Sequence, residues 1–147
     1  GIRGILLTRY GEQLPKALPA DVRHFPYIPL SALLPNAAAL VHHGGIGTSS
    51  QAMRAGIPQL IRPMAFDQFD NAFHLERLGV ALSIDLRLYN TTQVAKKLER
   101  LIKEPAYTLR CRAIARWFDG VDAVSESCDL IDKMINKRDA FKAGGRP

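Results

Sequence analysis

The chain has 147 residues, of which 47% are hydrophobic and 23% are charged, and its formal net charge is +6. This length and balance predict one soluble globular domain, and they exclude a membrane span because no apolar run approaches the roughly 18 residues that a span needs. The basic excess is spread over segments that also hold acidic residues, which is typical of a solvated surface. It therefore gives no indication of a nucleic-acid-binding protein.

The cysteine content bears on the cellular compartment. Cys111 and Cys128 are too few for a disulfide framework and too far apart in the sequence for a zinc site. Free thiols are typical of a reducing compartment, and no secretory signal is recognisable at the N-terminus, so we expect a cytoplasmic protein. The basic helical segments leave peripheral contact with an anionic membrane surface as an alternative.

Five short apolar runs alternate with segments of helical pattern. In chain order the predicted strands are Gly4–Thr8, Val22–Ile28, Ala37–His42, Gln59–Arg62 and Val80–Ile84. The predicted helices cover Thr48–Ala55, Asp67–Leu78, a segment from Thr91 that ends at Pro105, Tyr107–Phe118 and Val121–Lys137. The alternation predicts an α/β fold, an open and mostly parallel sheet with flanking helices, in one domain over residues 1–141 with a tail at 142–147. Ligands of such a sheet bind where its strands end.

The predicted helix over 67–78 has an apolar pattern of its own. Phe69, Phe73 and Leu75 are expected to lie together on one buried side, and Gly79 is expected to end the helix. A stripe of apolar residues is likewise expected on the helix from Thr91, formed by Val94, Leu98, Leu101 and Ile102.

The sequence His42-His43-Gly44-Gly45-Ile46-Gly47-Thr48 lies between a predicted strand and a predicted helix. Glycines at such a turn let a ligand approach the backbone closely, and the free N–H groups at the helix start favour a phosphate. His43 and the hydroxyl groups that follow add hydrogen-bond donors. The stretch therefore predicts a diphosphate pocket, and the alternative is a tight turn whose Ser and Thr residues only cap the helix.

A dinucleotide-binding fold is a competing interpretation of the same glycines. Gly45-x-Gly47-x-x-Ser50 nearly matches the pattern GxGxxG, and Asp67 follows at the distance of a ribose-binding acid. We reject this interpretation because the third glycine is missing and because Asp67 opens a helix instead of ending a strand.

Two further loops carry candidate ligand groups. Asp67 and Gln68 are adjacent at a predicted strand-to-helix loop, where a carboxylate and an amide are suited to bind sugar hydroxyls. Taken alone, Asp67 is also a good helix N-cap. Tyr27 lies between two prolines in an extended loop, where an exposed ring can stack on a base; ordinary packing of the ring is the alternative.

Taken together and in this order, these features resemble the UDP-glycosyltransferase superfamily of GT-B fold, in particular its bacterial sterol-glucosyl and rhamnosyl transferase-like members. The resemblance implies the nucleotide-sugar-binding C-terminal half of such an enzyme, a Rossmann-like sheet whose first strand and helix are expected to be missing. The matching stretches are Tyr27–Pro35, His42–Thr48, Ala55–Pro58 and Pro63–Ala72.

The resemblance implies donor-binding roles for nine residues and a catalytic role for none of them. In the order base, diphosphate, ribose and sugar, these residues are Tyr27 and Ile28; His43, Gly45, Gly47 and Thr48; Gln51; and Asp67 and Gln68. Gln51 departs from the pattern, because many members carry a glutamate there and an amide is not a charged acceptor for a ribose hydroxyl.

The implied reaction is a displacement with inversion, in which an acceptor hydroxyl attacks the anomeric carbon of a UDP- or dTDP-hexose and the diphosphate leaves. No DxD motif is present, so neither a metal nor another cofactor is implied. In the family, the catalytic base and the acceptor site lie in an N-terminal domain. No stretch of the given sequence resembles that domain. We expect that domain in cis or in trans and expect the chain alone to be inactive; the alternative is a non-catalytic binding or interaction module.

Overall fold

The chain is described from a computed structural model, which gives the backbone of residues 2–143 and the side chains of residues 2–135. It divides into two compact units, Gly1–Arg116 and Trp117–Pro147. The predicted strands and the predicted site residues all belong to the first unit, and the second contains one long helix, α6 (Ala123–Ala143). The single domain over 1–141 stays a prediction. Helix α6 extends into the predicted tail, of which residues 144–147 lie outside the described part.

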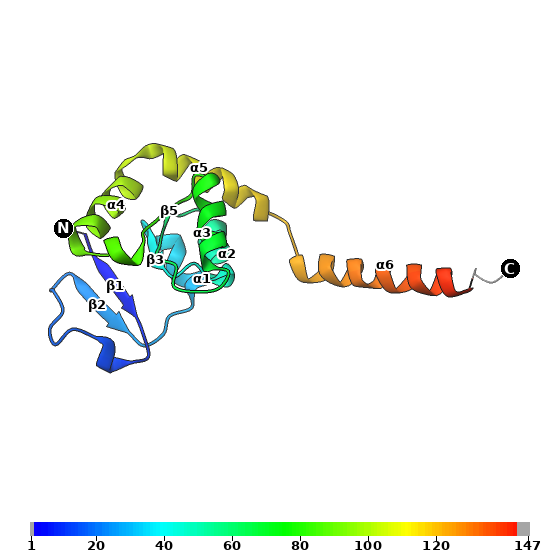
Figure 1. The fold of residues 1–147 in the computed structure, drawn as a ribbon, viewed down its shortest axis with the longest axis horizontal. Coiled ribbons are helices and arrows are strands. Elements are labelled where there is room, and N and C mark those ends of the chain that lie inside the picture. Colours follow the sequence, from blue (N-terminus) through cyan, green and yellow to red (C-terminus); the bar gives the residue numbers. More distant parts are fainter. Residues whose placement is uncertain (1, 144–147) are drawn as a thin grey trace. The chain divides into compact units, whose positions relative to one another are not determined.

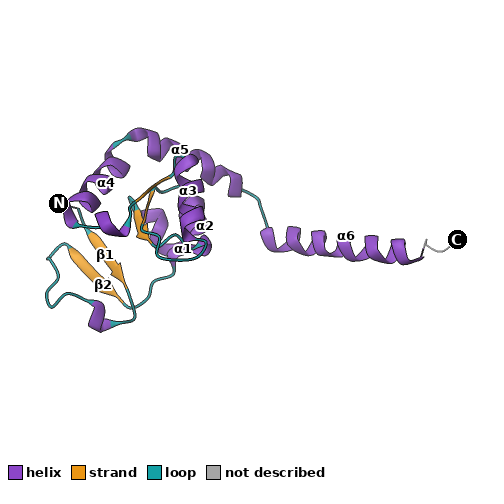
Figure 2. Ribbon diagram, viewed as in Figure 1, coloured by secondary structure: helices purple, strands orange, loops and turns teal. Residues whose placement is uncertain are grey.

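The first unit contains short parallel strands in two sheets (Figures 1 and 2). Strand β1 (Gly4–Leu7) pairs with β2 (Val22–Phe25), and β4 (Gln59–Ile61) lies between β3 (Leu40–His42) and β5 (Ala81–Ser83). The α/β class and the parallel pairing are confirmed, but the strands form two sheets where one was expected. The second strand ends at Phe25 and not at Ile28, because Pro26 has no N–H to donate to a neighbouring strand.

Helices connect the strands of the three-stranded sheet. Helix α2 (Ile46–Ala55) joins β3 to β4, α3 (Gln68–Arg77) joins β4 to β5, and α4 (Thr91–Lys103) and α5 (Pro105–Ala115) follow β5. Helix α1 (Leu30–Leu33) was not predicted, because a single turn is too short to show an apolar period. The same holds for the 3-10 turns Gly11–Gln13, Leu34–Asn36, Leu86–Leu88 and Arg116–Phe118.

The central strand β4 lies in the core of the first unit. Its three residues, Gln59, Leu60 and Ile61, are all 0% exposed. One apolar cluster joins β4 to α4 and consists of Leu60, Ile84 and Leu101 with Val94 and Leu98 beside them. It confirms three of the four residues of the predicted stripe, and the fourth, Ile102, is half-buried outside this cluster. A second cluster consists of Leu34, Ala52 and Ile57. With β4 packed in this way, the loop that follows it starts from a rigid base.

The expected buried side of α3 is wrong in two of its three residues. Leu75 is buried, but Phe69 and Phe73 are 56% and 54% exposed. The buried side is instead formed by Ala72 and Leu75, which are three residues apart and therefore neighbours on the helix surface. Ala72 is small enough to let α3 pack closely on β5, and this orientation leaves the two aromatic rings exposed.

The two cysteines differ in accessibility. Cys111 is buried on α5 and Cys128 is exposed on α6. Burial raises the pKa of Cys111 to about 11, so that at pH 8 only about one thiol in a thousand is the reactive thiolate. We expect a thiol reagent to modify Cys128 in the folded chain and Cys111 only after denaturation, which absorbance titration with and without urea would measure. Equal rates for the two thiols in the folded chain would contradict this burial, and a Cys128→Ser chain assigns the signal.

In the described part of the chain, none of the helices combines the length and the hydropathy that crossing a membrane requires.

Candidate functional site

The three segments singled out in the sequence all follow the carboxyl end of a parallel strand. Tyr27 comes after β2, His43 after β3 and Asp67 after β4. This is the edge at which ligands bind to open parallel sheets. Direct hydrogen bonds join the loops after β3 and β4, as described below, and no bond between described residues joins the Tyr27 loop to either of them.

The loop after β3 is shaped by the side chain of His42, the last residue of that strand. Its Nδ1 lies 3.1 Å from the N–H of Gly44, and its Nε2 lies 2.9 Å from Oε1 of Gln59 on β4. A backbone N–H can only donate, so Nδ1 accepts and the ring proton is assigned to Nε2, which donates to Gln59. Burial lowers the pKa of His42, the bond to Gln59 opposes this shift, and the nearby His43 adds to it. His42 is therefore neutral at pH 7.

The glycines of this loop have different structural roles. Gly44 has φ +95°, and a Cβ added there would lie 2.8 Å from Cγ2 of Ile61 and 3.2 Å from the carbonyl oxygen of Gln68. A Cβ at Gly45 would lie 2.7 Å from Nε2 of His43, whereas at Gly47 it would meet no atom within 4 Å. The fold itself therefore requires Gly44, the position of His43 depends on Gly45, and the surface at Gly47 is open.

Helix α2 begins at Ile46 with Gly45 at its N-cap, two residues earlier than predicted. No side chain caps it, so the expectation that hydroxyl residues cap this helix is wrong. Its first backbone bond runs from Ser49 N–H to Gly45, and the preceding N–H groups of Ile46, Gly47 and Thr48 have no backbone partner among the described residues. The hydroxyl-bearing Ser49 is fully buried. Thr48 is half-buried and His43 is exposed, so both add donors to the open helix end.

The loop after β4 holds the predicted pair Asp67 and Gln68. Asp67 occupies the N-cap position of α3 but makes no capping bond; its Oδ2 accepts instead from Nδ2 of Asn71 at 2.8 Å. The Oε1 of Gln68 accepts from the N–H groups of Met64 at 2.8 Å and Ala65 at 3.2 Å. Gln68 thus closes its own loop. Asp67 Oδ1 and Gln68 Nε2 make no hydrogen bond to another described residue, and both are left for a ligand.

Asn71 joins the two loops. Its Nδ2 donates to the carbonyl of Gly44 at 3.0 Å and to Asp67 at 2.8 Å. One amide group therefore fixes the histidine-glycine loop relative to the carboxylate loop. Sequence reasoning gave Asn71 no role of its own, and it missed His42 and Gln59 as well. The spacing of Asn71 four residues after Asp67, which places them on one helix face, is the signal that could have indicated the first contact.

Phe66 lies beside Asp67 in an unusual backbone conformation. Its φ is +56°, which costs a bulky side chain about 1–2 kcal/mol. Its ring is 93% exposed, and the side chain of Met64 in the same loop is 64% exposed. Strain of this kind is retained where a surrounding structure enforces it, and it is common at ligand sites. The carboxylate loop thus has an exposed apolar rim.

Tyr27 is exposed, as stacking on a base requires. Its side chain is 65% exposed, and the guanidinium carbon of Arg9 lies 5.6 Å from the ring centroid, a cation–π distance. Ile28 is half-buried and makes no backbone hydrogen bond to another described residue. Gln51 is exposed on α2. Tyr27 lies in a loop and Gln51 on a helix, as predicted, whereas Ile28 lies in the loop after β2 and not at the end of a strand. Among the described residues, none of the three bonds directly to the joined loops.

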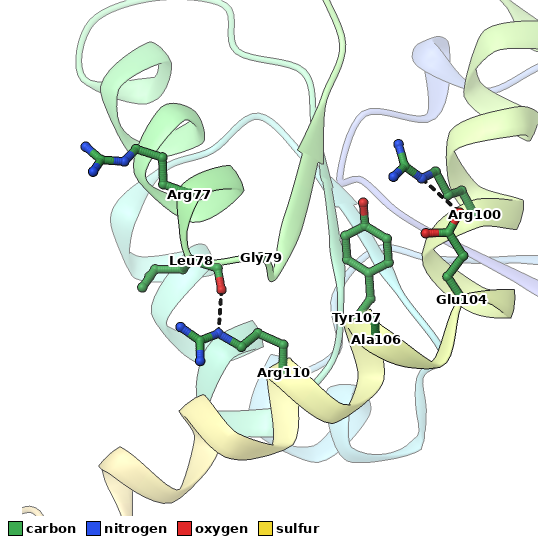
Figure 3. A pocket seen from close by; sticks show the side chains of 8 residues that line it. All are labelled: Arg77, Leu78, Gly79, Arg100, Glu104, Ala106, Tyr107 and Arg110. Atoms are coloured by element: carbon green, nitrogen blue, oxygen red, sulfur yellow. Dashed lines mark hydrogen bonds and ion pairs between the residues drawn. The ribbon is translucent and has the colours of Figure 1, made fainter.

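A groove of about 500 Å³ lies away from these loops, at the end of α3 and beside α4 and α5 (Figure 3). Arg110 Nε donates to the carbonyl of Leu78 at 2.8 Å, as Figure 3 shows. Arg100 pairs with Glu104 at 2.9 Å, and its guanidinium carbon lies 5.7 Å from the ring centroid of Tyr107. Both arginines bond other groups of the protein, and Arg110 caps the end of α3. We therefore interpret the groove as part of the packing between helices and not as a ligand site.

Comparisons with known proteins identify the family of the chain. Residues 5–120 match the family described as Erythromycin biosynthesis protein CIII-like, C-terminal domain. The chain is 38% identical over 131 residues to the aclacinomycin-T 2-deoxy-L-fucose transferase of Streptomyces galilaeus, covering 86% of this chain and 30% of that protein. It is 34% identical over 123 residues to the O-mycaminosyltylonolide 6-deoxyallosyltransferase of Streptomyces fradiae, covering 83% and 29%.

A solved structure of similar fold is the glycosyltransferase VinC in complex with dTDP. It aligns with a TM-score of 0.76 and 33% identity, covering 83% of this chain and 31% of that one. The chain therefore spans about 30% of the length of the relatives that it matches. The chain belongs to the erythromycin biosynthesis protein CIII-like C-terminal domain family, and its fold is that of the C-terminal part of GT-B UDP-glycosyltransferases.

Proposed function

We propose that this chain is the donor-binding part of an inverting glycosyltransferase and holds a UDP- or dTDP-hexose where β3 and β4 end. The observation that carries the proposal is the pair of loops that Asn71 joins. One loop presents His43 and the uncapped start of α2, which suit a diphosphate. The other presents Asp67 and Gln68, whose free oxygen and free amide suit sugar hydroxyls. Membership of the family supports the same assignment.

The arrangement also has a chemical consequence for transfer. When the bond between sugar and diphosphate breaks, negative charge grows on the leaving phosphate. The N–H groups at the start of α2, the hydroxyl of Thr48 and the ring of His43 would all donate to that charge. Donors fixed in advance stabilise a charge that develops in the transition state more than the charge already present in the bound substrate.

The nucleoside would lie beyond the diphosphate, with its base on Tyr27 and its ribose near Gln51. The exposure of Tyr27 and the unpaired backbone of Ile28 support a base there. An uncharged amide at Gln51 can bind a ribose hydroxyl without requiring the 2′-OH. The similarity to a transferase whose structure contains dTDP supports a thymidine nucleotide as one of the two candidates.

The groups assigned above all bind the donor, and none is assigned as the base that deprotonates an acceptor. We propose that a further domain supplies that base and the acceptor site, in the same polypeptide or in another one. The two free cysteines lead us to propose a cytoplasmic enzyme, with peripheral membrane contact as an alternative. If the chain were instead a non-catalytic module, nucleotide binding would remain without any transfer when an acceptor domain is supplied.

Calorimetric titration of the chain with nucleotides tests the proposal. UDP or dTDP should bind with a Kd below about 1 mM and without added metal, and UMP or dTMP about tenfold more weakly, because a phosphate with its charge-assisted hydrogen bonds is lost. Gln51→Ala should weaken UDP more than dTDP, which has no 2′-OH. Asp67→Ala should weaken only the sugar nucleotide and not the free diphosphate. The absence of binding by all four nucleotides at millimolar concentration would reject the proposal.

A further inference from the structure

The backbone of Gly44 is held on both sides, at its N–H and at its carbonyl, by side chains of different elements. His42 of β3 accepts its N–H at 3.1 Å, and Asn71 of α3 donates to its carbonyl at 3.0 Å. On the Cα side, Ile61 of β4 leaves no room for a Cβ. The backbone of Gly44, which precedes the free N–H groups of α2, therefore has little freedom to rotate.

One proton position determines this arrangement. Because the N–H of Gly44 must donate, Nδ1 of His42 must be unprotonated, and the single ring proton then points from Nε2 to Gln59 Oε1. The same requirement fixes the orientation of the side-chain amide of Gln59. Its Oε1 must face Nε2 of His42, because the NH₂ group of the amide could not accept a hydrogen bond from that ring nitrogen. A second proton on the ring would place an N–H against the N–H of Gly44 and break the contact.

We propose that neutral His42, paired with Gln59, is a positioning residue for the diphosphate. Together with Asn71, it fixes the backbone of Gly44 so that His43 and the N–H groups of α2 face the ligand. This inference rests on the proposed donor site and deepens it. His42 does not touch the ligand, and it acts only through the loop. Donor binding then requires the singly protonated ring and is lost when a second proton is bound.

Among the described residues, few charged or titratable groups lie near the ring of His42. The neighbouring titratable group along the chain is His43, which directly follows β3, with ring centroids 6.3 Å apart. On β4, Arg62 donates its backbone N–H to the carbonyl of His42, but its guanidinium lies over the ring of Tyr89. On α3, Asp67 accepts from Asn71. On α2 the first charged residue is Arg54, in the last turn, and β5 carries none.

The direction of the pH effect separates this role from direct ligand contact. Burial lowers the pKa of His42, so the binding-competent neutral ring prevails at neutral pH and is lost as the pH falls through that pKa. Protonation of a histidine that touches the diphosphate has the opposite effect, because added positive charge strengthens binding of an anion. The terminal phosphate of the ligand also takes up a proton near about pH 6 and weakens binding in every variant. An acid-side loss of affinity is therefore assigned to His42 only where it moves with the residue at position 59.

The test is the pH dependence of the UDP or dTDP Kd for the full chain and three variants. Gln59→Glu places a carboxylate against Nε2, raises the pKa of His42 and should move the acid limb up by about one pH unit. Gln59→Leu removes the bond that raises this pKa and should move the limb down. His42→Ala should weaken binding roughly three- to tenfold at pH 7, the range expected for one lost hydrogen bond, and leave only the acid limb of the ligand itself. His42→Asn, whose Oδ1 can accept from Gly44, should recover most of the affinity with only that same limb.

A ligand-free measurement keeps the inference testable if a buried variant fails to fold. Imidazole ¹⁵N shifts of the unmodified chain should show His42 as the neutral ring with its proton on Nε2. His74→Asn serves as the matched control and should not change the Kd profile. A proton on Nδ1, or an acid limb that stays in place in both Gln59 variants, would overturn the inference. If the ¹⁵N result holds but no nucleotide binds at any pH, the proposed function fails instead.

Discussion

Replacement of Gly44 by alanine should destabilise the chain more than any other single methyl group added to the candidate site. The new Cβ would lie 2.8 Å from Cγ2 of Ile61, which is 0% exposed on the central strand, and 3.2 Å from the backbone carbonyl of Gln68. Neither neighbour is the free end of a flexible side chain. The φ of +95° adds a strain that only glycine avoids.

The two contributions together give the expected size. Left-handed strain costs roughly 1–2 kcal/mol, and overpacking against a fixed core costs typically about 1–3 kcal/mol. Urea denaturation followed by circular dichroism should therefore show a free energy of unfolding lower by about 2–5 kcal/mol, a large part of the total for a small domain. A midpoint equal to that of the unmodified chain would show that the loop is not packed as described.

Gly47→Ala is the matched control for the same substitution. A Cβ at Gly47 meets no atom within 4 Å, and alanine is favoured over glycine in a helix by about 1 kcal/mol. The stability should therefore be unchanged or slightly raised. Nucleotide affinity should nevertheless fall, because the methyl group would occupy the open surface where we place the diphosphate. Gly44→Ala is thus expected to lower the stability of the fold, whereas Gly47→Ala is expected to lower nucleotide affinity without lowering stability.

The sequence predicted those elements whose signals are local. Gly56 and Gly79 end α2 and α3 with φ of +69° and +73°, as expected of glycines that close helices. The apolar stripe of α4 was predicted because thirteen residues give several turns of periodicity. The carboxyl ends of four of the five strands lie within one residue of the predicted ends, and only β2 ends three residues earlier.

The remaining features depend on contacts between distant residues, which a single sequence does not show. His42 bonds a residue 17 positions away, and Asn71 bonds one 27 positions away. The choice of face on α3 was decided by close packing at Ala72, although Phe69 and Phe73 are more hydrophobic. The division into two sheets depends on which strands pair, and each isolated run is compatible with either outcome.

These contacts divide the polar residues of the two loops into two groups. His42, Asn71 and the Oε1 of Gln68 are used within the protein and hold the loops in shape. His43, Thr48 and the free oxygen of Asp67 are left facing outward. Of the predicted ligand-binding residues, Gln68 uses its Oε1 within the protein, whereas His42 and Asn71 had no predicted role. The two groups should differ in their response to mutation, because only the first contributes to folding stability.

His43→Ala provides the clearest case of the second group. The ring is exposed and lies over Gly45, and no hydrogen bond to a described residue depends on it. The free energy of unfolding should change by no more than about 0.5 kcal/mol, as for surface positions in general. Affinity for UDP or dTDP should fall by roughly 10- to 100-fold, because a hydrogen bond to a charged phosphate contributes about 1.5–3 kcal/mol.

The affinities of the variant for UDP and for uridine together test this prediction. If His43 contacts the diphosphate, His43→Ala should weaken UDP strongly and leave the weak binding of uridine unchanged, as measured by calorimetry under one set of salt conditions. His74→Ala, which removes an exposed histidine paired only with Asp70 on α3, should alter neither. Equal weakening of UDP and uridine would move His43 away from the phosphates and toward the base. Since the N–H groups of α2 remain in the variant, the residual affinity for UDP measures what the helix start contributes without the imidazole.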